Sequence, residues 1–237
     1  MGGSWTIEQR VGSASSLHAS WPGSEAQPDR ARVALCRVEA PAVVLGSTQP
    51  DRVVDGDRAA AAGIAVARRR SGGGAVLVTP DDPVWIDVWL PIDHPLWRSD
   101  VGRAFHWLGE AWVDALTRSG IAGSASRRQG YLSCTRWSSL VCFGGVGTGE
   151  VVAEDGRKVV GLAQRRDRAG AWFHGACVLS WDAAPLLDVL AMAPDERSVA
   201  RAELDAAVAG TSELLRLTGR PALSGAAIAA AFVDSLP

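Results

Sequence analysis

A run of three glycines constrains this chain more than any other feature of its sequence. The segment from Ala67 to Val76 reads ARRRSGGGAV, so arginines and a serine precede the glycines and an apolar run follows them. Each glycine loses more backbone entropy on folding than other residues do, so three in a row are costly unless something must approach the backbone closely. Backbone amides and guanidinium groups suit an anion or a narrow acyl chain. A flexible loop beside a solvated charge run is the alternative that the residues alone leave open.

The composition is typical of a globular protein with a substantial core. The chain has 237 residues, 47% hydrophobic and 21% charged. Its formal net charge of -2 argues against a broad basic surface for nucleic acid or an acidic membrane. The sequence has neither a secretory signal pattern at its start nor a long apolar span, so we expect a cytoplasmic protein without membrane partners. Its four cysteines are irregularly spaced and are expected to be reduced.

One lysine stands out among the basic residues. Of the 24 basic residues, 23 are arginine and only Lys158 is lysine. In a chain that uses arginine almost everywhere, a retained lysine indicates a position that needs a compact ammonium charge rather than a planar guanidinium group.

Hydrophobic periodicity predicts strands before and around the glycines and helices after them. The helix that begins after Val101 has Ser99 or Asp100 as its N-cap and Gly120 just past its end. Asp155-Gly156 lies between two apolar runs and predicts a tight hairpin with Lys158 on the returning strand. The segments 75–78 and 84–90 are predicted to form a second hairpin. Further strands are expected at 32–39, 42–46, 63–69 and 171–181, a helical turn at 57–62, and helices from 183 onward.

These elements predict an α+β fold with a mixed, largely antiparallel sheet packed with helices. We expect one domain over residues 1–237, with a core at 32–181 and a helical C-terminal tail at 183–237. Metal binding is not expected, because the cysteines and histidines lack close ligand pairs. His18, His94 and His106 have no companion motif and are expected to be structural.

Two motifs together resemble the biotin/lipoate protein ligase catalytic family. The segment RRRSGGGAV, followed later by DGRKVVGLAQRR, is similar to the family patterns R-R-x-S-G-G-G-A-V and G-[RK]-K-[IV]-x-G-x-A-Q-x-R. A histidine-glycine pair on the next strand is also similar. The matching residues are Arg68, Arg69, Ser71, Gly72, Gly73, Gly74, Ala75, Lys158, Gly161, Ala163, Gln164, His174 and Gly175.

The resemblance implies a class II synthetase-like fold and acylation of a carrier-protein lysine. In the family, the glycine loop and arginines hold lipoate or octanoate as an acyl-adenylate made from ATP and Mg²⁺, and the lysine matched by Lys158 contacts the reacting groups. The acceptor would be a lipoyl domain of a dehydrogenase E2 subunit or of glycine cleavage H protein type. The sequence alone favours this lipoate-protein ligase as the first interpretation.

Departures from the family pattern keep two alternatives open. Where ligases carry G-R-N-D, this chain reads LVCFGGVGTGEVV. Its CF pair resembles that of octanoyl or lipoyl transferases. Their cysteine takes the acyl group from a carrier thioester, for example on acyl carrier protein, without ATP. Cys142 would then be the nucleophile, with a buried structural cysteine as the alternative. The cysteine of a second transferase type would fall at Ala171, which excludes that mechanism. The other alternative is a non-catalytic protein that binds lipoate or a carrier domain.

Overall fold

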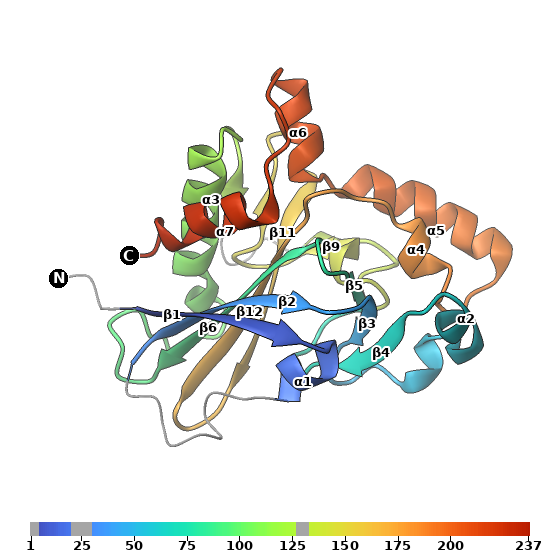
Figure 1. The fold of residues 1–237 in the computed structure, drawn as a ribbon, viewed down its shortest axis with the longest axis horizontal. Coiled ribbons are helices and arrows are strands. Elements are labelled where there is room, and N and C mark those ends of the chain that lie inside the picture. The colour runs from blue at the N-terminus through green and yellow to red at the C-terminus, as the bar shows by residue number, and fades with distance from the viewer. Residues whose placement is uncertain (1–4, 20–29, 127–132) are drawn as a thin grey trace.

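The computed structural model describes residues 5–19, 30–126 and 133–237, and this part of the chain forms three β-sheets flanked by helices (Figure 1). The largest sheet has seven strands in the order β1-β2-β6-β12-β11-β10-β7. Only the β1–β2 pair is parallel among its described neighbours. These strands are β1 (Thr6–Gly12), β2 (Arg32–Val38), β6 (Val84–Pro91), β7 (Ala125–Ser126), β10 (Val151–Val152), β11 (Lys158–Arg166) and β12 (Gly170–Cys177).

The smaller sheets complete the strand inventory of the described residues. A three-stranded sheet has the order β4-β3-β5, and a two-stranded sheet pairs β8 with β9. Their strands are β3 (Ala42–Leu45), β4 (Ala65–Arg68), β5 (Val76–Val78), β8 (Ser133–Cys134) and β9 (Gly145–Val146). The expected mixed, largely antiparallel α+β architecture is therefore confirmed.

The predicted hairpin between residues 75–78 and 84–90 is wrong. β5 pairs with β3 in the three-stranded sheet, whereas β6 lies between β2 and β12 in the large sheet. A turn in which Thr79 bonds to the carbonyl of Asp82 through its amide and its hydroxyl redirects the chain from one sheet to the other. β2 and β12 occupy the two edges of β6, so no edge remains for β5.

Helices cover the large sheet and extend beside the three-stranded one (Figure 1). The α-helices are α1 (Ala14–Ala19), α2 (Gly56–Ala61), α3 (His106–Arg118), α4 (Ala184–Leu187), α5 (Pro194–Ala207), α6 (Thr211–Leu217) and α7 (Gly225–Val233). Short 3₁₀ helices are η1 (Asp51–Val53), η2 (Arg103–Phe105) and η3 (Cys142–Gly144).

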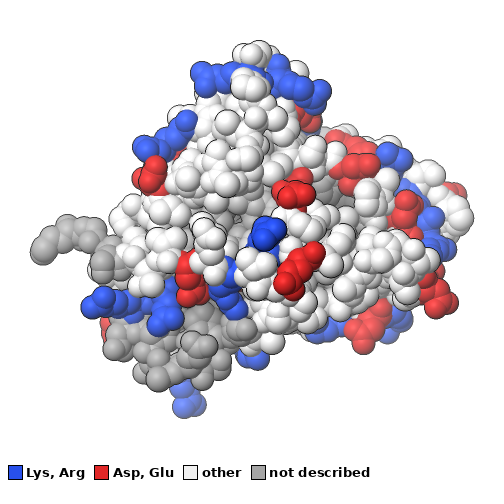
Figure 2. Space-filling model, viewed as in Figure 1, with Lys and Arg blue, Asp and Glu red and all other residues white. Residues whose placement is uncertain are grey.

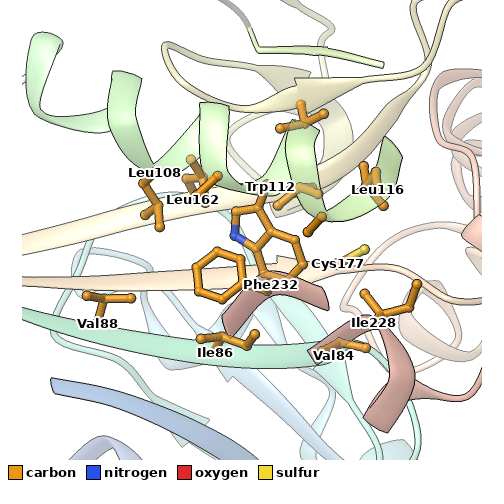
Figure 3. Packing of buried hydrophobic residues seen from close by; sticks show 14 of the residues in the cluster. Val84, Ile86, Val88, Leu108, Trp112, Leu116, Leu162, Cys177, Ile228 and Phe232 are labelled. Atoms are coloured by element: carbon orange, nitrogen blue, oxygen red, sulfur yellow. The ribbon is translucent and has the colours of Figure 1, made fainter. Parts of the chain in front are cut away.

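The main core lies between one face of the large sheet and helices α3 and α7 (Figure 3). Trp112 of α3 is fully buried and packs against Phe232 of α7 with ring centroids 4.5 Å apart. Alternate residues of β6, including Ile86 and Val88, point into the same core because side chains alternate along a strand. The last helix of the chain is therefore a wall of the main core.

Two local signals in the sequence produced the expected structures. Gly156 has φ +88°, and the hairpin that it closes joins β10 to β11, with Lys158 as the first residue of β11. The helix expected from Val101 begins later, at His106, and Asp100, one of the two expected caps, instead accepts a hydrogen bond from the amide of Arg103 in η2, which has Gly102 as its N-cap and leads into α3. Gly120 follows α3 with φ +86°, as the sequence predicts for a helix C-terminus.

Surface charges are mixed in sign. In the view of Figure 2, basic and acidic side chains are interspersed among wide uncharged areas. Among the described residues, none of the helices is long and apolar enough to cross a membrane.

Candidate active site

The side chain of Arg69 organises the glycine loop between β4 and β5. Its guanidinium is buried and donates hydrogen bonds to the carbonyls of Val44, Gly72 and Gly74 at 2.7–3.2 Å. Four contacts to backbone oxygens use most of the five N–H groups that an arginine offers. Arg69 thus fixes the shape of the loop from inside.

The glycines admit another segment of this chain rather than leaving space. A Cβ on Gly74 would lie 2.5 Å from the carbonyl carbon of Val141 and 2.8 Å from the amide nitrogen of Cys142. Next to it, Ala75 donates to the carbonyl of Leu140 at 2.8 Å and accepts from the amide of Cys142 at 2.9 Å. Backbone-to-backbone docking therefore places Cys142 against the glycine loop.

The remaining loop residues differ in exposure. Gly73 has φ +99°, a conformation that favours glycine, and a Cβ added to Gly72 would have no described atom within 4 Å. Ser71 is buried, and its hydroxyl has no hydrogen-bond partner among the described residues. Arg68 points away from the loop interior and donates to the carbonyls of Gly46 and Gln49 and to Asp51.

Lys158 is enclosed and fully hydrogen-bonded. Its side chain is 1% exposed, and Nζ lies 2.9 Å from the carbonyl oxygen of Cys142 and 2.8 Å from that of Gly145. A carboxylate oxygen of Glu150 is 2.7 Å from the same nitrogen, and the ring of Phe143 is 4.9 Å away. The ammonium therefore ties the start of β11 to the backbone of the segment that carries Cys142.

An apolar cavity unites residues from both sequence motifs. Its volume is about 50 Å³, and its walls come from both the large and the three-stranded sheets. Gly161 would place a Cβ 3.3 Å from the ring of Phe143, so glycine keeps this wall clear. The predicted site residues that line the cavity are Arg69, Cys142, Gly161, Ala163, His174 and Gly175.

The polar side chains of His18, Trp85 and Asp87, which lie in or beside the cavity, were not among the predicted site residues. His174 Nδ1 lies 2.7 Å from Asp87 Oδ1, which also accepts a hydrogen bond from the indole of Trp85. The ring of His18 stacks on Trp85 with centroids 4.5 Å apart and meets the ring of His174 edge-on at 5.2 Å. Burial, followed by the nearby His174, lowers the pKa of His18 to about 3. These groups come from α1, β6 and β12, and only the pairing of Asp87 with His174 in the sheet brings them together.

Other predicted residues lie away from the cavity. The side chain of Gln164, farther along β11, donates to the carbonyl of Val101 at 2.7 Å and accepts from Arg166. Cys134 is exposed, whereas Cys177 is buried in the main core, where burial raises the pKa of its thiol. In the part of the chain that the structure describes, no three histidine, cysteine or acidic residues gather as metal ligands.

Comparisons with known proteins agree with this architecture. The model of the lipoyl protein ligase A/B catalytic domain matches residues 21–236. The octanoyltransferase LipM of Kyrpidia tusciae is 32% identical over 144 residues, which are 60% of this chain and 52% of that protein. LipM of an Exiguobacterium species is 30% identical over 168 residues, 70% of this chain and 60% of its own. The chain thus spans between half and two thirds of these relatives.

A solved structure extends the likeness to nearly the whole chain. A bi-partite lipoate protein ligase, studied with its E2 lipoyl domain from Thermoplasma acidophilum, superimposes with a TM-score of 0.73 at 20% identity. The match covers 97% of this chain and 81% of that one, and it confirms the expected fold. Together with the family model, it places this chain in the lipoyl protein ligase A/B catalytic domain family.

Proposed function

We propose that this protein transfers octanoyl or lipoyl groups to a lysine of a lipoyl domain, with Cys142 as the nucleophile and without ATP. The observation that carries the proposal is the position of Cys142. Its backbone is docked on the glycine loop, its side chain lines the apolar cavity, and its carbonyl accepts a hydrogen bond from Lys158. A nucleophile in the wall of an apolar cavity suits an acyl group bound as a thioester.

The reaction balances as two acyl transfers. The thiolate of Cys142 attacks the thioester carbonyl of an acyl group on a donor such as acyl carrier protein, and the donor thiolate leaves and takes up a proton. The uncharged amine of the acceptor lysine then attacks the acyl-cysteine, and Cys142 leaves as thiolate while the amine nitrogen loses a proton and forms the amide. The ammonium of Lys158, which donates a hydrogen bond to the carbonyl of Cys142, offsets negative charge that develops in both steps.

The contacts of the basic side chains favour transfer over the ligase that the sequence alone puts first. A ligase must offer donors to the triphosphate of ATP, which binds with Mg²⁺, and to an acyl-adenylate. Here Lys158 donates its hydrogen bonds to Glu150 and two carbonyls, and Arg69 donates four to carbonyls of the glycine loop and of Val44. The relatives named octanoyltransferase point the same way.

The acceptor is a lipoyl domain of an E2 subunit or of glycine cleavage H protein type. Support comes from the solved ligase, which was studied with an E2 lipoyl domain. A lysine on such a domain must reach the acyl group held on Cys142, which the half-buried position of that residue permits.

Intact-mass spectrometry tests the proposal. We expect the protein to gain one octanoyl group when incubated with octanoyl-acyl carrier protein, and to pass it to an added lipoyl domain. Cys142→Ser should form no thioester, whereas Cys134→Ser, which alters an exposed cysteine, should behave as the unmodified chain does.

A second arm supplies octanoate or lipoate with ATP and Mg²⁺ in place of the thioester. Acylation of the lipoyl domain only in this arm, and undiminished in Cys142→Ser, would establish the ligase instead. Binding of lipoate or of the lipoyl domain with no acylation in either arm would leave the non-catalytic binding protein.

A further inference from the structure

Glu150 occupies a position in which every neighbour is a hydrogen-bond donor. One carboxylate oxygen accepts from the amide of Leu162 at 2.9 Å, and the other accepts from the amide of Gly147 at 2.7 Å and from Lys158 Nζ at 2.7 Å. The residue is 7% exposed. A carboxylate accepts at both oxygens, whereas the amide of a glutamine would turn its NH₂ group toward one of these donors whichever way it is oriented.

The hydrogen bonds of Lys158 connect Glu150 to the backbone of Cys142. An ammonium has three N–H donors, and here their partners are Glu150 and the carbonyls of Cys142 and Gly145. No donor remains for a substrate in this arrangement. Lys158 therefore acts on Cys142 through its charge and through the backbone that it holds.

Burial makes the carboxylate necessary for this arrangement. A charged group out of water is costly unless it is paired and hydrogen-bonded, and removing one partner of a buried pair leaves the other uncompensated. Two carbonyls and an aromatic ring alone are a weak environment for the ammonium of Lys158. Without the carboxylate, Nζ would leave its place beside the carbonyl of Cys142.

We propose that Glu150 is a positioning residue that holds Lys158 in place and thereby sets the reactivity of Cys142 without touching the substrate. The proposal rests on the proposed function in one respect, that Cys142 is the nucleophile. It predicts that thiol chemistry at Cys142 depends on Glu150 only as long as Lys158 is present.

The first test measures the rate at which iodoacetamide alkylates Cys142, in a Cys134→Ser background and read by peptide mass spectrometry. Glu150→Gln should slow the reaction by about tenfold, because the ammonium of Lys158 is no longer held beside Cys142. The matched control is Glu213→Gln, which removes the ion pair of a half-exposed glutamate with Arg157, the residue beside Lys158. The control should react as the background does. An unchanged or faster rate in folded Glu150→Gln would overturn the proposal.

A double-mutant cycle tests whether Glu150 acts through Lys158. Lys158→Met should itself slow alkylation, and adding Glu150→Gln to it should change the rate by less than about twofold. Multiplication of the two single effects would contradict the proposal, since Glu150 would then act independently. Circular dichroism checks folding, and if Glu150→Gln does not fold, Glu150→Asp replaces it because it keeps the charge with a shorter reach. A rate equal to the background in folded Glu150→Asp would also overturn the proposal.

The two proposals can fail separately. If the chain forms no acyl-cysteine but the alkylation cycle shows coupling, the proposed function is wrong and the positioning role of Glu150 stands. If Cys142 is acylated and the cycle shows no coupling, the transferase stands and Glu150 is only structural.

Discussion

His18 should make folding stability fall in mild acid. Its ring is buried between Trp85 and His174, and its pKa of about 3 in the folded chain compares with 6.5 in the unfolded one. His174, Arg69 and Arg10 oppose its positive charge and Asp87 favours it, but burial is the largest cause. Below pH 6.5 the unfolded chain therefore binds a proton at His18 that the folded chain does not, so stability is present above this pH and is lost as pH falls toward 3.

The size of the effect follows from the difference between the two pKa values. About pH 5 is 1.5 units below the unfolded value, and each unit is worth about 1.4 kcal/mol, so His18 alone should cost about 2 kcal/mol of unfolding free energy there. Other groups also titrate in this range, so the useful quantity is the difference between the chain and His18→Phe, which keeps a ring and loses the titration.

Urea denaturation at about pH 8 and about pH 5 measures that difference. The unmodified chain should lose about 2 kcal/mol more than His18→Phe over this interval. Ser15→Ala, an exposed change in the same helix, is the control and should follow the unmodified chain. An equal loss of stability in the chain and in His18→Phe would refute the reasoning.

Three further substitutions test the site and the core. Lys158→Arg keeps the charge but has no room for a planar guanidinium, so acyl transfer should fall by about a hundredfold, and full activity would contradict the role given to Lys158. Gly74→Ala would push against Val141, so it should lower the unfolding free energy by about 1–3 kcal/mol. It should also slow acyl-enzyme formation in the mass assay. An unaltered melting temperature would show that the backbones of Gly74 and Val141 are not this close. Trp112→Ala opens a cavity between α3 and α7 and should lower the unfolding free energy, measured by urea denaturation, by about 3–5 kcal/mol. The fraction that stays folded should retain acylation. A decrease of less than about 1 kcal/mol would mean that this core is loosely packed.

The elements that the sequence predicted correctly have local causes. Alternation in residues 84–90 and the Asp155-Gly156 turn each depend on a few neighbouring residues, and each formed as expected. Helical spacing after Val101 located α3, although that helix begins only at His106. The assignment of strands to sheets was harder, because it depends on partners far away in the chain. β5 and β6 are close in sequence, yet β5 pairs with β3, whereas β6 pairs with β2 and β12.

The same distinction applies to the site. Glycine and lysine motifs could be found because each is contiguous, and the structure brings Arg69, Cys142 and His174 to one cavity. Glu150 and His18 gave no such signal. Glu150 lies just before β10 and contacts Lys158 at the start of β11, and His18 reaches the cavity from a short helix before β2. Neither relation has a fixed spacing that a motif could express.

The order in which the chain is synthesised gives the contact between Lys158 and the C-terminal region a further consequence. The carbonyl of Lys158 accepts a hydrogen bond from the amide of Ala209 at 2.9 Å, and α7 closes the core behind the strands that carry the site. Domains fold as units and synthesis proceeds from the N-terminus, so Cys142 and Lys158 leave the ribosome well before Ala209 and α7. A nascent chain therefore carries the thiol and the lysine before the core behind their strands can close, and that core is complete only after α7 has been made.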